Sequence, residues 1–125
     1  MKRVLIVERD RLHGELIREW LEQGGAQSIC AGSLTAAPAG IDAILIDVAS
    51  QQQAHAVLRS WRCAYPRVAI VAASGRFSPG DMANDAMART LGVTGILAKP
   101  FTRSDLWAVL GLPARPPTPQ GAPRR

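Results

Sequence analysis

The sequence predicts a doubly wound α/β fold, in which a five-stranded parallel sheet is covered by helices on both faces. Short apolar runs, each long enough for one buried strand, alternate along the chain with segments whose apolar residues recur at helical spacing. Such alternation implies parallel strands joined by right-handed crossover helices. The chain has 125 residues, 47% of them hydrophobic, which is enough for one core and therefore for one domain.

Five segments are predicted to be strands, and the first has the pattern of a strand that is buried on both faces. They are residues 3–8, 27–31, 41–48, 68–72 and 95–98, of which 41–48, with the sequence IDAILIDV, is the clearest. The stretch 32–40, between the second and third strands, is weakly patterned and contains a proline. We therefore expect at most a shortened helix there.

The first two clear helices have start and stop signals. Asp10 is placed to cap the first helix, and Gly24 ends it. The second helix carries apolar residues at helical spacing from Ala54 to Tyr65 and is stopped by Pro66.

The last two helices begin with equally clear signals. Ser78 is placed as the cap of a helix with Pro79 at its first position, and this helix is expected to run to Leu91. Thr102 and Asp105, three residues apart, nearly form a capping box at the start of the final helix.

The charge distribution argues against a nucleic-acid-binding protein. The net charge is +5, but residues 113–125 hold three arginines and no acid, so the other 112 residues carry only +2. Basic residues do not cluster on any expected helix face. The tail 113–125 is rich in Pro and Arg and has little apolar content, so it is predicted to be disordered, with the folded domain at residues 1–112.

Other features favour a cytoplasmic protein without a membrane segment. The longest apolar runs are far below the roughly 18–20 residues that a membrane span needs, and no secretory signal is present. The two cysteines, Cys30 and Cys63, are expected to be reduced thiols in the core.

Ionisable residues stand at the ends of three of the predicted strands. Glu8 ends the first strand, Asp47 lies near the end of the third, and Lys99 follows the fifth. In an open parallel sheet the ligand crevice lies at the carboxyl ends of the strands. A carboxylate that ends an apolar strand is costly to desolvate and needs a partner. Asp47 is therefore either a cap for the next helix or, as its placement with Glu8 and Lys99 favours, part of a shared site.

Three segments, VLIVERD, IDAILIDV and ILAKPF, resemble in order and spacing the signature segments of response-regulator receiver domains. The resemblance covers about residues 2–112. It implies the sheet order 2-1-3-4-5 and a phosphoacceptor role for Asp47, which would take a phosphoryl group from a partner's phosphohistidine. It also implies that Lys99 contacts the phosphoryl group, through a cis bond to its proline, and that Glu8, Asp47 and the carbonyl of Ala49 hold Mg²⁺.

The sequence also departs from the receiver pattern. Arg9 replaces the second acid of the first strand, Ala72 replaces the hydroxyl residue of the fourth, and Ile96 falls where many receivers carry a switching aromatic. Ser74 either supplies the hydroxyl, if the loop is offset by two residues, or is a turn residue before Gly75. Asp10 could substitute for the missing acid if Arg9 turns out to solvent.

The charges of Glu8, Arg9, Asp47 and Lys99 sum to zero without a metal ion, so Mg²⁺ binding is expected to be weak or absent. Arg9 is then either a counter-ion of the site or an outward-facing bystander.

The resemblance predicts a single-domain response regulator in phosphorelay signalling, which is not an enzyme. Its expected partners are a histidine kinase or phosphotransfer protein and a downstream protein, or a second copy bound through the fourth helix, fifth strand and last helix. The corresponding side chains are Met82, Ile96, Leu106 and Trp107, for which simple packing is the alternative.

Two other functions remain open. One is a phosphorylation-independent pseudo-receiver that acts as an interaction module, with Arg9 replacing the metal. The other, less favoured, is a flavodoxin-like binder of a small ligand, which lacks a glycine-rich phosphate loop. The two histidines, His13 and His55, are expected to be solvated on helix faces.

Overall fold

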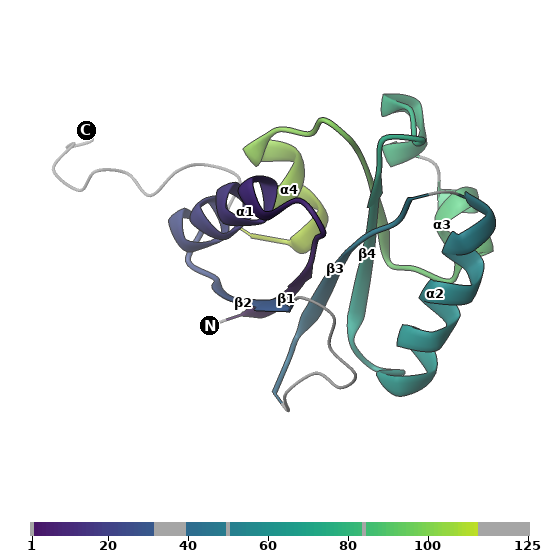
Figure 1. The fold of residues 1–125 in the computed structure, drawn as a ribbon, viewed down its shortest axis with the longest axis horizontal. Helices are drawn as coiled ribbons and strands as arrows, with labels where there is room; N and C mark the ends of the chain where they lie inside the picture. Colours follow the sequence, from purple (N-terminus) through teal and green to yellow (C-terminus); the bar gives the residue numbers. More distant parts are fainter. Residues whose placement is uncertain (1, 32–39, 50, 84, 113–125) are drawn as a thin grey trace, which may run out of the picture.

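The computed structural model describes residues 2–31, 40–49, 51–83 and 85–112 (Figure 1). In chain order the elements are β1 (Arg3–Val7), α1 (Arg11–Gln23), β2 (Gln27–Ala31), β3 (Ala43–Asp47), α2 (Gln51–Ala64), β4 (Ala69–Ser74), the 3₁₀ helix η1 (Pro79–Ala83), α3 (Asp85–Leu91), β5 (Gly95–Ala98) and α4 (Arg103–Leu110). The predicted short helix in 32–40 and the predicted disordered tail lie almost wholly outside the described residues.

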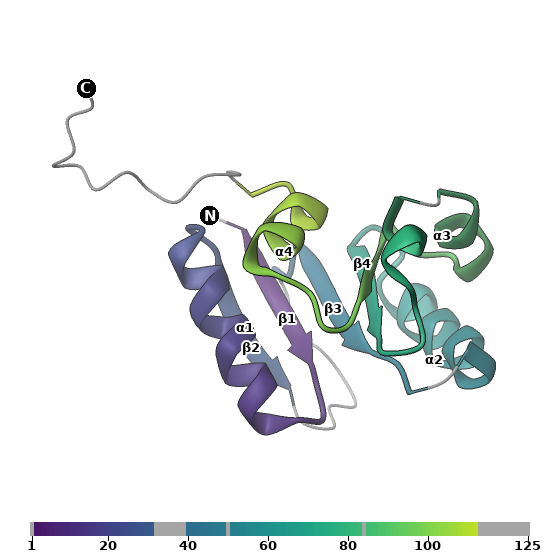
Figure 2. The same cartoon turned by 90° about the horizontal axis from the view of Figure 1, so that it is seen from above.

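The strands form one sheet with the order β2-β1-β3-β4-β5, and every neighbouring pair is parallel. Helices α1 and α4 cover one face of the sheet and α2 and α3 cover the other (Figures 1 and 2). The predicted doubly wound fold and its strand order are confirmed. None of the described helices is both long enough and apolar enough to cross a membrane.

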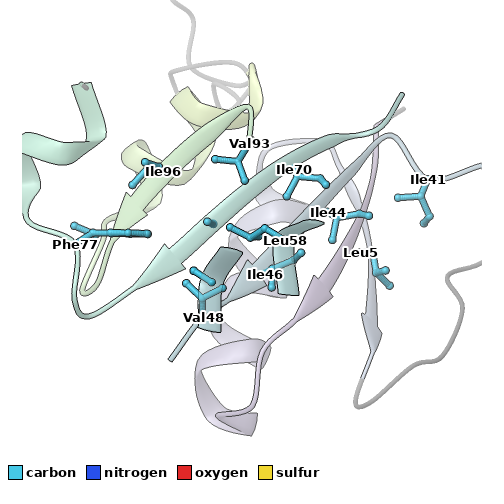
Figure 3. Close-up of a cluster of buried hydrophobic side chains, with 13 residues drawn as sticks. Leu5, Ile41, Ile44, Ile46, Val48, Leu58, Ile70, Phe77, Val93 and Ile96 are labelled. Carbon is cyan, nitrogen blue, oxygen red and sulfur yellow. The ribbon is translucent and has the colours of Figure 1, made fainter. Parts of the chain in front are cut away.

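The core is split by the sheet into two layers because successive strand residues point to opposite faces. In β3, Ile44 and Ile46 pack beneath α2 and α3 (Figure 3), whereas Ala43 and Leu45 pack beneath α1 and α4. All four are almost completely buried, which explains why this segment is apolar without alternation.

The predicted caps of the first and last helices are present. The Asp10 carboxylate accepts hydrogen bonds from the backbone N–H groups of Leu12 and His13, at 3.0 and 3.2 Å. Thr102 and Asp105 bond each other's backbone N–H groups reciprocally, both at 3.0 Å. These caps fix the chain where it leaves β1 and β5, which is the end of the sheet that carries the candidate site.

Two expectations about local structure were wrong. The single helix predicted from Pro79 is divided into η1 and α3, and Asp81 bonds back to the N–H of Ser78 at 2.7 Å, which closes a short turn at its start. Cys30 and Cys63 are free but exposed rather than buried. Cys30 lies on the edge strand β2, and Cys63 lies in the last turn of α2.

Candidate functional site

Three charged side chains meet at the carboxyl edge of the sheet. Glu8 directly follows β1, Asp47 is the last residue of β3, and Lys99 directly follows β5. The Lys99 ammonium donates to Asp47 Oδ1 and to Glu8 Oε1, each at 2.8 Å. The side chains of Asp47 and Glu8 are 9% and 5% exposed. The prediction that Glu8, Asp47 and Lys99 lie together at this edge of the sheet is confirmed.

The two carboxylates stabilise the protonated form of Lys99. Burial alone lowers the pKa of a lysine, but the hydrogen bonds to Asp47 and Glu8 and the charges of both carboxylates outweigh it. The pKa of Lys99 therefore lies above its usual value. Its backbone N–H donates to the carbonyl of Ser74 at 3.0 Å, and its bond to Pro100 is cis, as the resemblance implied.

Arg9 contacts the same carboxylate from the solvent side. Its Nε and Nη2 atoms each lie 3.2 Å from Asp47 Oδ2. The arginine side chain is 72% exposed, so the contact is partly screened by water. Of the two orientations expected from the sequence, the structure shows the counter-ion and not the bystander.

Glu8 has a full set of partners. Its Oε1 lies 3.0 Å from His13 Nδ1 as well as bonding Lys99, and its Oε2 accepts from the backbone N–H of Asp10 at 3.1 Å. The His13 ring also packs against Phe101, with ring centroids 5.3 Å apart. The expectation that His13 is solvated was wrong, because the capped first turn of α1 brings it over the end of β1. Sequence reasoning missed this partner of Glu8.

A cleft of about 500 Å³ opens beside Asp47. Its lining includes Ala49 from the loop after β3, Ser74 and Arg76 from the end of β4 and the loop beyond it, and Asp10. Asp10 lines the cleft, but its carboxylate is engaged in capping α1. Its role as a substitute acid stays a prediction.

Ser74 lines this cleft, whereas Ala72 does not. Strand β4 extends to Ser74, two residues further than predicted, and its Oγ accepts from the N–H of Arg76 at 3.0 Å. Ala72 is completely buried among apolar side chains under α2 and α3. The hydroxyl of Ser74 is engaged in the turn after β4, so its role as the missing hydroxyl of the site stays a prediction.

The side chains expected to form a partner surface are mostly core residues. Ile96, Leu106 and Trp107 are at most 2% exposed, and Trp107 Nε1 donates to the carbonyl of Trp20 at 2.8 Å. Simple packing, the alternative for these three residues, is what the structure shows. Met82 is half-buried beside them.

The acidic residues do not fit a divalent metal ion in this arrangement. Mg²⁺ needs oxygen ligands at about 2.0–2.1 Å, but each oxygen of Asp47 faces a cation and each oxygen of Glu8 accepts from an N–H group or contacts His13. In the described part of the chain no three acidic, histidine or cysteine side chains gather as a metal-binding group.

Solved structures of response regulators share this fold. A response regulator from Thermotoga maritima superimposes with a TM-score of 0.73 and 20% identity, over 89% of this chain and 95% of that one. The chemotaxis protein CheY4 of Vibrio cholerae matches with a TM-score of 0.66 and 23% identity, over 89% and 97%.

A third matching structure contains a phosphorylated aspartic acid. A response regulator from Burkholderia pseudomallei, with a phosphorylated aspartic acid, a calcium ion and citrate, matches with a TM-score of 0.69 and 18% identity, over 88% of this chain and 66% of that one. No protein-family model and no curated protein matches the sequence. At these identities the comparisons establish that the chain has the receiver-domain fold.

Proposed function

We propose that this chain is a receiver module of phosphorelay signalling, which accepts a phosphoryl group on Asp47 and acts through contacts with other proteins. The observation that supports this most is the 2.8 Å contact between Asp47 and Lys99 at the mouth of an open cleft, within a receiver-domain fold. The donor would be the phosphohistidine of a histidine kinase or phosphotransfer protein.

Phosphoryl transfer to Asp47 requires positive charge around the transferred group. An oxygen of Asp47 forms the new bond to phosphorus while the bond between phosphorus and the donor's imidazole nitrogen breaks, and the imidazole leaves with the bonding electrons. The carboxylate and the phosphoryl oxygens repel each other, so nearby cations stabilise the transition state. Among the residues that the structure describes, Lys99 and Arg9 are the cations in contact with Asp47.

Access to the carboxylate requires Arg9 to move. An ion pair with a highly exposed arginine contributes at most about 1 kcal/mol, so the Arg9 side chain can leave Asp47 Oδ2 at little cost. Lys99, which is less exposed and bonds two carboxylates, stays in place. Lys99 therefore keeps Oδ1 of Asp47 oriented, while Oδ2 becomes free to attack the phosphoryl group once Arg9 has moved.

Intact-mass measurement after incubation with a small phosphodonor tests the proposal. The wild-type chain is expected to gain the mass of one phosphoryl group, and Asp47→Asn, which keeps the shape of the side chain, is expected to gain none. Absence of a gain in the wild type, or a gain that persists in Asp47→Asn, contradicts the proposal.

A second candidate is a pseudo-receiver that binds its partner without phosphorylation. The contact between Arg9 and Asp47 favours it, because the carboxylate is already neutralised. In that case Asp47→Asn and the phosphodonor both leave partner binding unchanged. Phosphorylation of Asp47 that alters the chain's amide NMR spectrum beyond the cleft would exclude this candidate.

A further inference from the structure

We propose that Arg9 stands where a divalent metal ion would otherwise balance the charge of Glu8 and Asp47, and that this one side chain keeps the cleft free of metal. The inference rests on the proposed function only in placing the chemistry at Asp47. It assigns to Arg9 a charge-balancing role, in which the guanidinium neutralises the acceptor carboxylate while Lys99 orients it.

The contacts of Asp47 show how the guanidinium fills this role. Two nitrogens of Arg9 lie 3.2 Å from Oδ2, while Lys99 bonds Oδ1 at 2.8 Å. Both oxygens of a carboxylate that is only 9% exposed therefore face a cation. A metal ion at Oδ2 would meet the positive charge of Arg9 as well as that of Lys99.

Glu8 offers a metal ion no better ligand. Its Oε1 contacts both Lys99 and His13, and its Oε2 accepts from the N–H of Asp10. Asp10 in turn is tied into the cap of α1. The acids near Asp47 are thus already engaged, and a metal ion would have to break several of these contacts to be held by oxygens.

The charge balance points the same way. Glu8 and Asp47 carry two negative charges, and the ammonium and guanidinium groups in contact with them carry two positive charges. A divalent cation would bring the cluster to a net charge of +2. With a carboxylate in place of the guanidinium the cluster would carry −2, which a divalent cation neutralises.

Residue 9 lies where a carboxylate in place of the guanidinium could contribute to binding a metal ion. It lies between Glu8, at the end of β1, and the N-cap residue Asp10, and its side chain lines the same cleft as Asp47. An acid there lies within reach of a cation bound by Asp47. Carboxylate and carbonyl oxygens are the ligands that Mg²⁺ prefers.

Arg76 provides a matched control. It lines the cleft from the loop after β4, is exposed, and makes no ion pair within the residues that the structure describes. Arg76→Asp therefore changes the net charge by the same amount as Arg9→Asp without touching Asp47. The two variants separate a specific effect at Asp47 from a general effect of charge.

The experiment is a calorimetric titration of the full chain with Mg²⁺ alone, with no phosphodonor present. The wild type and Arg76→Asp are expected to show no saturable binding at millimolar Mg²⁺. Arg9→Asp is expected to bind at least about tenfold more tightly, because two charge units change beside a divalent ion at an effective dielectric of about 20. Saturable sub-millimolar binding by the wild type, or equal affinity of the two variants, overturns the inference.

Folding and function are kept separate in this test. If circular dichroism shows that Arg9→Asp is unfolded without metal, Mg²⁺ should restore its structure, and Arg9→Asn, which removes only the positive charge, should show a smaller gain in affinity. If neither Arg9→Asp nor Arg9→Asn responds to Mg²⁺, the inference is also overturned. A wild type that is not phosphorylated, together with Mg²⁺ binding by Arg9→Asp, contradicts the proposed function and leaves this inference standing.

Discussion

The guanidinium group of Arg9 lies against the carboxylate of Asp47, with two of its nitrogens 3.2 Å from the same oxygen. Lys99 holds the other oxygen at 2.8 Å. One cation is largely exposed and the other is mostly shielded from solvent. The two therefore differ in what they contribute to stability, to pH dependence and to the chemistry of the cleft.

Removing the ammonium group should cost far more stability than removing the guanidinium. Lys99→Met leaves Glu8 and Asp47 nearly buried and without their shared partner, and is expected to lower the free energy of unfolding by about 3 kcal/mol. Arg9→Met, at an exposed ion pair, is expected to cost less than about 1 kcal/mol. Urea denaturation of both variants measures the difference, and equal losses would contradict this account.

The raised pKa of Lys99 predicts a loss of stability at alkaline pH. The folded protein keeps the lysine proton at a pH where the unfolded chain has lost it, so the contribution is complete below the unfolded pKa of about 10.4 and falls above it. The difference in unfolding free energy between the wild type and Lys99→Met should be flat from neutral pH to about pH 9 and shrink above pH 10.4. A difference that grows with alkaline pH would have the wrong sign.

Gly24 is predicted to be intolerant of a side chain because of what packs against it. A Cβ at this position would lie 2.8 Å from Nε1 of Trp107, whose ring is buried and bonded to the carbonyl of Trp20. Gly24→Ala should cost about 1–3 kcal/mol through overpacking. Gly75→Ala, where a Cβ meets nothing within 4 Å, is the control, and its thermal denaturation midpoint should stay close to that of the wild type.

Much of the fold followed from periodicity. The segments 27–31 and 95–98 form strands with the predicted bounds. The meeting of Glu8, Asp47 and Lys99 also followed, since parallel strands bring their carboxyl ends to one edge of the sheet.

The features that the sequence did not predict depend on three-dimensional packing. His13 contacts Glu8 only because the cap of α1 turns the chain back over β1. The exposure of Cys30 depends on the position of β2 at the edge of the sheet. The extension of β4 to Ser74 depends on its pairing with β5, which no local pattern encodes.

The central claim is that Asp47 accepts a phosphoryl group with positive charge from Lys99 and Arg9 and without a metal ion. Phosphorylation in the absence of added metal tests this claim most directly. The intact mass of the wild type and of Asp47→Asn should be measured after incubation with a small phosphodonor, once with Mg²⁺ and once with a chelator. The account predicts a gain of one phosphoryl group in the wild type under both conditions and none in Asp47→Asn. A wild-type chain that gains no mass in either condition, or gains it only with Mg²⁺, would contradict it.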